Sequence, residues 1–311
     1  MTGIDIIWKI RHARAKLVAM IYLNNKLVPQ DKALISVFDH GFLYGDGIYE
    51  TLRAYKGTVF MLDEHIDRLF HSASMIGLDI KRTGDAVKRA VHETIKANRH
   101  HEAYIRITVS RGAGPIGLDP ELCPEPTFVV MSKEFRDYPA QYYQKGVKIA
   151  VVSTRRNYKL SLDPAIKSLN FLNNILAKVE AKERGAYEAV MLNYRGYIAE
   201  GTISNVFFVK DSVLCTPSTG VGILGGITRG IILDLAREAG VETKEGRFRP
   251  EDMYNAQEVF ISNTTMEVMP VSDVGDAGIC RGPGRTTKML HKAYREKVGE
   301  YILNELKRRS V

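Results

Sequence analysis

Lys167 is the residue whose type and setting could carry covalent chemistry. It lies between Ile166 and Leu169 in the segment Ala-Ile-Lys-Ser-Leu-Asn. Apolar surroundings would lower the pKa of this amine, and a lysine with a lowered pKa can act as a nucleophile that forms a Schiff base. The alternative is a surface lysine whose methylene groups cover neighbouring apolar side chains. Taken alone, the spacing favours the surface lysine.

Glu200 could supply a buried negative charge. It stands in Tyr-Ile-Ala-Glu-Gly-Thr, at the end of a short predicted strand. A carboxylate held there could keep a pyridine nitrogen protonated, and the protonated ring would then act as an electron sink. A solvent-exposed acid at the end of a strand explains the same residue, and taken alone it is the commoner case.

Two further features could bind an anion. Gly225 and Gly226 lead directly into a predicted helix, whose free N–H groups and positive dipole end suit a phosphate. The hydroxyl of Thr228 would be an additional donor. Arg68, on the polar side of an earlier predicted helix, could also reach an anion. An ordinary helix start and a solvent-exposed arginine explain these residues equally simply.

Other common catalytic patterns are absent from the sequence. The eight histidines form no His-Glu-x-x-His pair, and there is no Gly-x-Ser-x-Gly segment. The Gly-Asp-Gly at 45–47 lacks the strand–helix context of a dinucleotide site. Cys123, Cys215 and Cys280 are far apart and show no Cys-x-x-Cys spacing, which argues against a structural zinc site or a disulfide framework. These thiols favour a reduced, cytoplasmic protein.

The composition is that of a globular protein. The chain has 311 residues, of which 45% are hydrophobic and 26% charged, enough for one large domain or two ordinary ones. No apolar run approaches the roughly 20 residues that a membrane span needs. Lys and Arg outnumber Asp and Glu by 44 to 36, a net charge of +8 that suits anionic small molecules as well as nucleic acid. Without a basic block interleaved with aromatic residues, nucleic-acid binding is the weaker interpretation.

Two α+β domains with a cleft between them are predicted. Residues 1–19 would be a loosely attached N-terminal extension and residues 20–133 the N-terminal domain. Residues 134–146 lack clear periodicity and are predicted to be the linker. Residues 147–311 would form the C-terminal domain, which carries both Lys167 and Glu200.

Apolar periodicity predicts the elements of these domains. The predicted strands are 21–23, 26–28, 48–55, 59–62, 104–110, 128–131, 147–153, 189–192, 197–199, 206–209 and 259–262. The predicted helices are 63–77 with Asp63 as its cap, 84–97, a segment within 165–184, 225–239, and the residues from 286 onward. In the helix within 165–184, the expected inward residues are Leu169, Leu172, Ile175 or Leu176, and Val179.

Five motifs occur in a single order along the chain. They are Phe38–Gly47, Glu64–Leu69, Lys167–Asn170, Glu200–Thr202 and Gly226–Arg229. From about Met20 to near the C-terminus, this order resembles the class IV aminotransferases, which are fold-type IV pyridoxal-phosphate enzymes. The resemblance implies a two-domain α+β fold, D-amino acid aminotransferase-like, with the cofactor in the interdomain cleft. It also implies a homodimer, or a larger homo-oligomer, with active sites near the subunit interface.

The resemblance assigns a role to each candidate residue. Lys167 matches the lysine that forms a Schiff base with pyridoxal 5′-phosphate and then moves the substrate proton, and Glu200 matches the carboxylate that faces the pyridine nitrogen. The phosphate would be bound by Arg68, Ile227, Thr228 and Thr264. The substrate pocket would be lined by Tyr44, Tyr49, Thr51, Arg53, Tyr104, Arg106 and Thr265.

Three activities occur within this family: transamination of branched-chain L-amino acids with 2-oxoglutarate, transamination of D-amino acids, and aminodeoxychorismate lysis. The segment 110–120 is similar to prokaryotic branched-chain enzymes and lacks the Arg and His that D-amino acid enzymes place there. Thr51 replaces the usual glycine and matches a threonine of the lyases, Phe171 replaces the usual tyrosine, and the segment 263–270 is lyase-like. We nevertheless expect a branched-chain aminotransferase, because Lys167 and the loop 117–120 match those enzymes over longer stretches; the lyase is second and the D-amino acid enzyme third. A non-enzymatic cofactor-binding protein is a further alternative.

Overall fold

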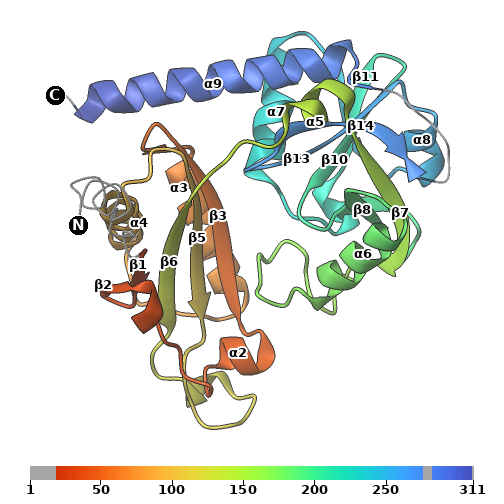
Figure 1. Cartoon of the computed structure of the whole chain (residues 1–311). Helices are drawn as coiled ribbons and strands as arrows, with labels where there is room; N and C mark the ends of the chain where they lie inside the picture. The colour runs from red at the N-terminus through yellow and green to blue at the C-terminus, as the bar shows by residue number, and fades with distance from the viewer. Residues whose placement is uncertain (1–18, 276–281, 310–311) are drawn as a thin grey trace, which may run out of the picture.

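Two β-sheets, each packed against helices, make up the fold (Figure 1). The computed structural model describes residues 19–275 and 282–309. The predicted extension, apart from its last residue, and Cys280 lie outside the described residues. Within the described ranges, no helix combines the length and the apolar character that crossing a membrane would require.

The first sheet is antiparallel throughout, with the strand order β2-β1-β6-β5-β3-β4. Its strands are β1 (Met20–Leu23), β2 (Lys26–Pro29), β3 (Gly47–Tyr55), β4 (Thr58–Val59), β5 (Ala103–Ser110) and β6 (Thr127–Glu134). Alternate residues of β5, such as Ile105 and Ile107, are fully buried because successive side chains point to opposite faces. They share a core with apolar residues of α3 (Leu62–Met75) and α4 (Gly84–Asn98).

The second sheet is mixed, with the order β12-β11-β10-β13-β14-β7-β8-β9. Its strands are β7 (Val147–Arg155), β8 (Glu188–Leu192), β9 (Ile198–Gly201), β10 (Asn205–Lys210), β11 (Val213–Pro217), β12 (Thr243–Gly246), β13 (Glu258–Asn263) and β14 (Glu267–Val274). The pairs β11–β12, β14–β7 and β7–β8 are parallel. Helix α6 (Leu172–Glu183) packs on β7 and β8 through Ala177 and Ala181, while α7 (Ile227–Glu238) packs near Phe207 and Phe260.

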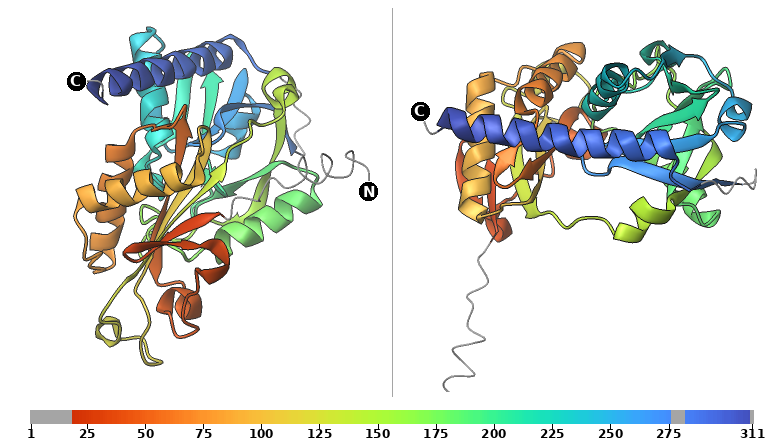
Figure 2. Two further views of the ribbon diagram at one scale, coloured as in Figure 1. Left: turned by 60° about the vertical axis from the view of Figure 1, so that its left-hand side comes forward. Right: turned by 90° about the horizontal axis from the view of Figure 1, so that it is seen from above.

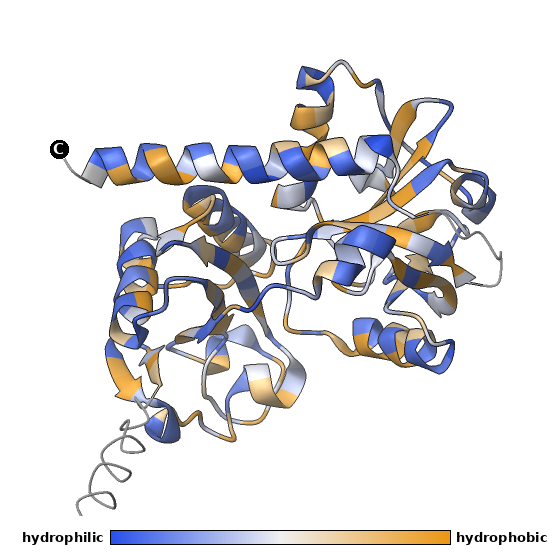
Figure 3. Cartoon of the chain, turned by 45° about the horizontal axis from the view of Figure 1, so that its top comes forward, coloured by the Kyte–Doolittle hydropathy of each residue, from blue (hydrophilic) through white to orange (hydrophobic). Residues whose placement is uncertain are grey.

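The long C-terminal helix α9 (Arg285–Arg309) runs along both sheets (Figure 2). Its hydrophobic and hydrophilic residues alternate along its length (Figure 3), and Leu290, Tyr294, Val298 and Ile302 form a buried stripe at intervals of four. Phe60, which follows β4, packs edge-on against Tyr294 at 5.8 Å between ring centroids. This core cluster contains residues from the regions of both sheets, so it does not mark a boundary between two domains. The division into domains at 20–133 and 147–311 stays a prediction.

Many predicted elements are confirmed, including the hairpin at Asn24–Asn25 and the helix at 84–97. Two details were wrong. Met61 rather than Asp63 is the N-cap of α3, and Asp63 lies in its first turn. The strand expected at 59–62 ends at Val59, because α3 begins at Leu62. Residues 134–146 include the helix α5 (Ala140–Lys145), and their role as a linker stays a prediction. The short helices α2 (His40–Tyr44) and α8 (Pro250–Tyr254) and the strands β11, β12 and β14 were not predicted.

The burial predicted for the helix within 165–184 was also wrong. This helix, α6, begins only at Leu172, and four apolar side chains on it are more than half exposed: Leu172, Ile175, Leu176 and Val179. Its buried residues are Asn174, Ala177 and Ala181. The small alanines let α6 approach β7 and β8 closely, so the larger apolar residues are left on the outer face.

Candidate active site

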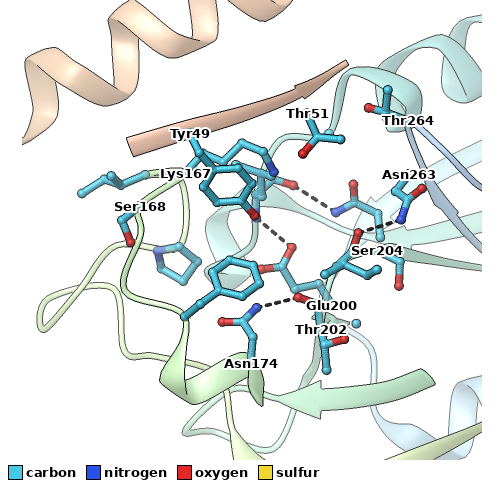
Figure 4. A pocket seen from close by; sticks show the side chains of 18 of the residues that line it. Tyr49, Thr51, Lys167, Ser168, Asn174, Glu200, Thr202, Ser204, Asn263 and Thr264 are labelled. Carbon is cyan, nitrogen blue, oxygen red and sulfur yellow. Dashed lines mark hydrogen bonds between the residues drawn. The ribbon is translucent and has the colours of Figure 1, made fainter. Parts of the chain in front are cut away.

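A cavity of about 230 Å³ is lined by residues from both sheets (Figure 4). Tyr49 and Thr51 come from β3, and Tyr104 and Arg106 come from β5. The second sheet contributes Glu200 at the end of β9. Further lining residues come from α3, from the first turn of α6, from the segment 156–171 and from the loops around 203, 226 and 264.

Lys167 is fixed by backbone pairing with β3 rather than by a helix. The N–H of Tyr49 donates to the Lys167 carbonyl at 2.9 Å, and the N–H of Leu169 donates to the Gly47 carbonyl at 2.8 Å. The N–H of Lys167 donates to the Ser72 hydroxyl at 3.2 Å. This short bridge directs the lysine into the cavity from the connection before α6.

The environment of Lys167 makes its amine less basic. Desolvation and the nearby Arg68 lower the pKa of Lys167 to about 8, although the carboxylates of Glu50 and Glu200 oppose this shift. The Nζ atom lies 4.6 Å from the centre of the Tyr49 ring. A larger share of the amine is therefore neutral near physiological pH than for an ordinary lysine. The interpretation as a surface lysine is wrong.

Glu200 is a buried carboxylate with two direct partners. Arg156 donates from Nε to Oε1 at 2.8 Å, and the N–H of Leu224 donates to Oε2 at 3.0 Å. Burial raises the pKa of Glu200, while Arg156 opposes the rise. Arg156 could not be identified from the sequence, because its place just after β7 was the only available signal and arginines at strand ends are common.

The start of α7 forms a second part of the site. Gly226 is its N-cap, and the N–H groups of the first turn have no partners within the helix. A Cβ added at Gly226 would lie 2.1 Å from Oδ1 of Asn205, so there is no room for a side chain at this position. Arg68 lies beside this helix start, because its Nη1 donates to the Gly225 carbonyl at 3.0 Å.

Arg68 is held by a buried carboxylate that the sequence analysis did not find. Its Nε and Nη2 donate to the two oxygens of Glu50 at 2.7 and 2.9 Å. His65 adds a contact from Nδ1 to Glu50 at 2.8 Å. Burial raises the pKa of Glu50, but Arg68 and His65 outweigh it and hold this pKa well below its ordinary value. Glu50 does not line the cavity, and nothing in the sequence pattern distinguished it from a solvent-exposed acid.

Most of the predicted site residues lie on this one cavity. They are Tyr49, Thr51, Arg68, Tyr104, Arg106, Lys167, Glu200, Ile227, Thr228, Thr264 and Thr265. Arg106 stacks over the Tyr49 ring, with its guanidinium carbon 3.9 Å from the ring centre. Phe171 also lines the cavity and packs edge-on against Tyr49 at 5.5 Å.

Two predicted pocket residues do not line the cavity. Tyr44, at the end of α2, accepts a hydrogen bond from the N–H of Gly117 at 3.3 Å. Arg53 follows Thr51 on the same face of β3, but its side chain is buried in ion pairs with Glu267 and Asp137. The expectation that this chain's own Tyr44 and Arg53 line its pocket is therefore corrected, because neither is among the residues that line the cavity.

A partly buried amine, a buried carboxylate and a helix start with free N–H groups lie around one cavity, and this arrangement suits an enzyme that uses a Schiff base and a phosphorylated cofactor. The family model of amino-transferase class IV matches residues 47–274. The chain belongs to this family, which confirms the predicted family and the prediction of an aminotransferase-type enzyme. Members of the family use pyridoxal 5′-phosphate, so the predicted cofactor is confirmed as well.

Three relatives are similar over nearly the whole chain. A Methanocaldococcus jannaschii protein, named provisionally as a branched-chain-amino-acid aminotransferase, is 43% identical and the match covers 89% of this chain and 95% of that one. A D-alanine aminotransferase of Bacillus licheniformis is 33% identical, with 89% and 96% covered. The aminodeoxychorismate lyase of Bacillus subtilis is 31% identical, with 91% and 96% covered.

Solved structures agree with the fold. The branched-chain amino acid aminotransferase of Escherichia coli superposes with a TM-score of 0.86 at 31% identity, covering 90% of this chain and 94% of that one. A second branched-chain amino acid aminotransferase, solved with pyridoxamine 5′-phosphate, has the same TM-score and identity, with 90% and 93% covered. These matches confirm the predicted two-domain α+β fold class of fold-type IV enzymes.

The cavity of this chain fits the cofactor's three reactive or charged parts. Lys167 supplies an amine of lowered pKa for the aldehyde carbon. Glu200, paired with Arg156, supplies a buried carboxylate for the pyridine nitrogen. The bare backbone at Gly226 and the first turn of α7 suit the phosphate. Since these three features converge from separate segments, the fit does not rest on any single motif.

Proposed function

We propose that this protein is a pyridoxal-phosphate-dependent aminotransferase that exchanges the amino group between branched-chain L-amino acids and 2-oxoglutarate. The observation that carries the proposal is the partly buried Lys167, whose pKa is lowered to about 8, in the same cavity as the buried Glu200. The 43% identity to the M. jannaschii relative supports the branched-chain substrate. The separated thiols of Cys123 and Cys215 support a cytoplasmic enzyme.

Each side chain of the site has a defined task in this reaction. The cofactor, when bound, supplies an acceptor for the electrons of the substrate's Cα–H bond. Nζ of Lys167 would accept the proton from the substrate α-carbon and deliver it to the C4′ carbon of the bound cofactor, not back to the α-carbon. Glu200 holds the proton of the pyridine nitrogen, while Arg156 keeps the carboxylate ionised and oriented. Ile227, Thr228, Thr264 and Arg68 orient the phosphate end.

The decisive experiment compares two activities of the purified, cofactor-loaded protein. One assay follows glutamate formed from L-leucine, L-isoleucine or L-valine with 2-oxoglutarate, and the other follows pyruvate formed from aminodeoxychorismate. Strong transamination with little pyruvate is the expected result. Pyruvate formation without transamination would contradict the proposal and favour the lyase.

The lyase is the second candidate because Thr51 lines the cavity. By the resemblance to the lyases, Thr51 matches a threonine whose hydroxyl assists the reaction of those enzymes. The similarity to the B. subtilis lyase supports this alternative, and the D-alanine aminotransferases support a third. D-alanine in the same transamination assay distinguishes that third candidate from the first.

The lowered pKa of Lys167 predicts the pH dependence of cofactor capture. Only the neutral amine attacks an aldehyde, so the fraction of reactive amine rises with pH and levels off above the pKa. We expect the rate at which the apo-protein binds pyridoxal phosphate to rise up to about pH 8 and then level off. Stopped-flow absorbance measures this rate, with free Nα-acetyl-lysine as the control. A rate that keeps rising like that of free lysine beyond about pH 9 would contradict the lowered pKa.

We also propose that the protein is a homodimer. Large apolar side chains are exposed on α6 and around α2, namely Leu172, Ile175, Leu176, Val179, Phe38, Phe42, Ile116 and Leu118. Exposed apolar areas of this kind are typical of protein interfaces. Tyr44 lies on α2, so a partner docked there would bring this predicted substrate residue close to an active site.

Changing both Ile175 and Leu176 to aspartate should convert the dimer into a monomer. Both side chains are more than half exposed, so the new charges would lose their hydration at a subunit interface but not within the fold. Size-exclusion chromatography with light scattering measures the mass. Leu303→Asp is the matched control, because Leu303 is similarly exposed but lies on α9. A dimer that persists in the α6 variant would contradict this interface.

A further inference from the structure

The turn between β13 and β14 forms one wall of the cavity, and the side chain of Asn263 holds its shape through hydrogen bonds to other residues of the turn. Thr264 and Thr265 of this turn line the cavity. Oδ1 of Asn263 accepts hydrogen bonds from the N–H of Thr265 at 2.9 Å, the N–H of Met266 at 2.7 Å and the Thr265 hydroxyl at 3.0 Å. The turn is therefore a compact unit, which Nδ2 of Asn263 also ties to the Ile203 carbonyl at 3.1 Å.

Arg53 lies behind the turn and contacts its backbone. Its Nη1 donates to the Thr265 carbonyl at 3.3 Å and to Oε1 of Glu267 at 2.9 Å, and its Nη2 donates to Asp137 at 2.8 Å. The guanidinium lies between two aromatic rings, 4.3 Å from the centre of Tyr55 and 4.0 Å from that of Phe135. Only 4% of the Arg53 side chain is exposed, so its contacts to the turn and to both carboxylates are made in the interior of the protein.

Glu267 ties the same turn to the C-terminal helix. Its backbone has a φ of +58°, which a non-glycine residue adopts only where the surroundings hold it. Its buried carboxylate accepts from Arg53 and Tyr55 through Oε1, and from His291 and Arg295 of α9 through Oε2. Burial raises the pKa of Glu267, but these partners outweigh it and lower the pKa to about 2.

We propose that Arg53 and Glu267 are positioning residues that hold the 263–266 turn against the cavity and so set where Thr264 and Thr265 meet cofactor and substrate. The proposal rests on the proposed function for the identity of those ligands. The planar fork of Arg53 reaches a carbonyl of the turn and two carboxylates at once, which a lysine cannot do. Arg53, which the sequence predicted to bind substrate, is thereby assigned a different role, that of supporting the wall of the pocket.

Arg53→Lys tests the proposal because it keeps the positive charge but removes the planar guanidinium group that donates to the turn and to both carboxylates. We expect the KM for the amino donor to rise at least about tenfold, with kcat changed less than about threefold. Independently of activity, hydrogen exchange of the Thr265 and Met266 amides should accelerate at least about tenfold, while the strands of the first sheet keep their protection. A merely structural role would lower the melting temperature without this localised change.

Arg111→Lys is the matched control. Arg111 is also buried, binds both oxygens of Asp46 and donates to the carbonyls of Gly77 and Ile76, but it does not line the cavity. This variant should lose thermal stability while its KM and the exchange of the 263–267 segment stay unchanged.

Asp137→Asn provides a second, milder variant. Asp137 is 68% exposed, so its replacement does not threaten folding, yet it removes one carboxylate from Arg53. We expect exchange of the turn to rise about threefold. A folded Arg53→Lys protein with normal KM and normal exchange overturns the proposal. If that variant does not fold, unchanged exchange in Asp137→Asn overturns it. If the wild-type protein shows no transamination, the proposed function fails and the exchange data alone decide the role of Arg53.

Discussion

Replacing Lys167 with alanine should lower transamination at least about 10³-fold while the protein still folds. The methyl side chain can neither bind the cofactor's aldehyde nor move the proton at the substrate α-carbon. The backbone bridge to β3 uses only main-chain atoms of residue 167, so it survives the substitution. Turnover is measured with L-leucine and 2-oxoglutarate, and folding by circular dichroism.

A second readout separates lost chemistry from lost structure. Borohydride should attach the cofactor to the wild-type chain at Lys167 and leave the alanine variant unlabelled, as mass spectrometry of peptides would show. Lys159→Ala is the control, because Lys159 is 57% exposed and pairs only loosely with Asp163, at 3.7 Å. Retained turnover in Lys167→Ala would refute the role of this lysine.

Replacing Glu200 with glutamine should lower kcat about 10²-fold. The amide has nearly the same shape but no charge, so it cannot hold the proton on the pyridine nitrogen. It also leaves Arg156 without the carboxylate that it contacts at 2.8 Å. The effect should be larger on kcat than on KM, since the charge matters most when electrons move into the ring. Steady-state kinetics with saturating 2-oxoglutarate measure both constants.

A carboxylate away from the site provides the comparison for Glu200. Glu180 accepts hydrogen bonds from Ser153 and Thr154 but does not line the cavity. Glu180→Gln should therefore leave kcat unchanged. A Glu200→Gln enzyme whose kcat stays within about threefold of wild type would contradict a role for the charge at position 200.

Local elements of the fold could be read from the sequence because short-range patterns determine them. The two-residue turn at Asn24–Asn25 permits a hairpin, and the apolar repeat at 84–97 needs only one buried helix face. The helix that follows Gly226 was predicted for the same reason. The elements β11, β12 and α8 were missed because they are short, and a segment of so few residues shows no clear apolar periodicity.

The candidate site was predicted in part. Lys167, Glu200 and the start of α7 each carried chemistry that the residue type alone suggests, and the five ordered motifs joined them into one family. Arg156, which pairs with Glu200, and Glu50, which pairs with Arg68, could not be predicted, because each pair joins residues in or beside different secondary-structure elements. The same limit applies to Arg53, whose role depends on Glu267, 214 residues further on.

By itself, the sequence determined the family and the cofactor, and most of the site residues predicted from it line the cavity, because ordered motifs record chemistry directly. Only the tertiary structure decided the environment of each residue. It lowered the pKa of Lys167 by burial, removed Arg53 from the pocket into ion pairs and left the apolar side of α6 exposed. Burial and charge depend on every segment that packs around a side chain, and no local pattern specifies which segments those are.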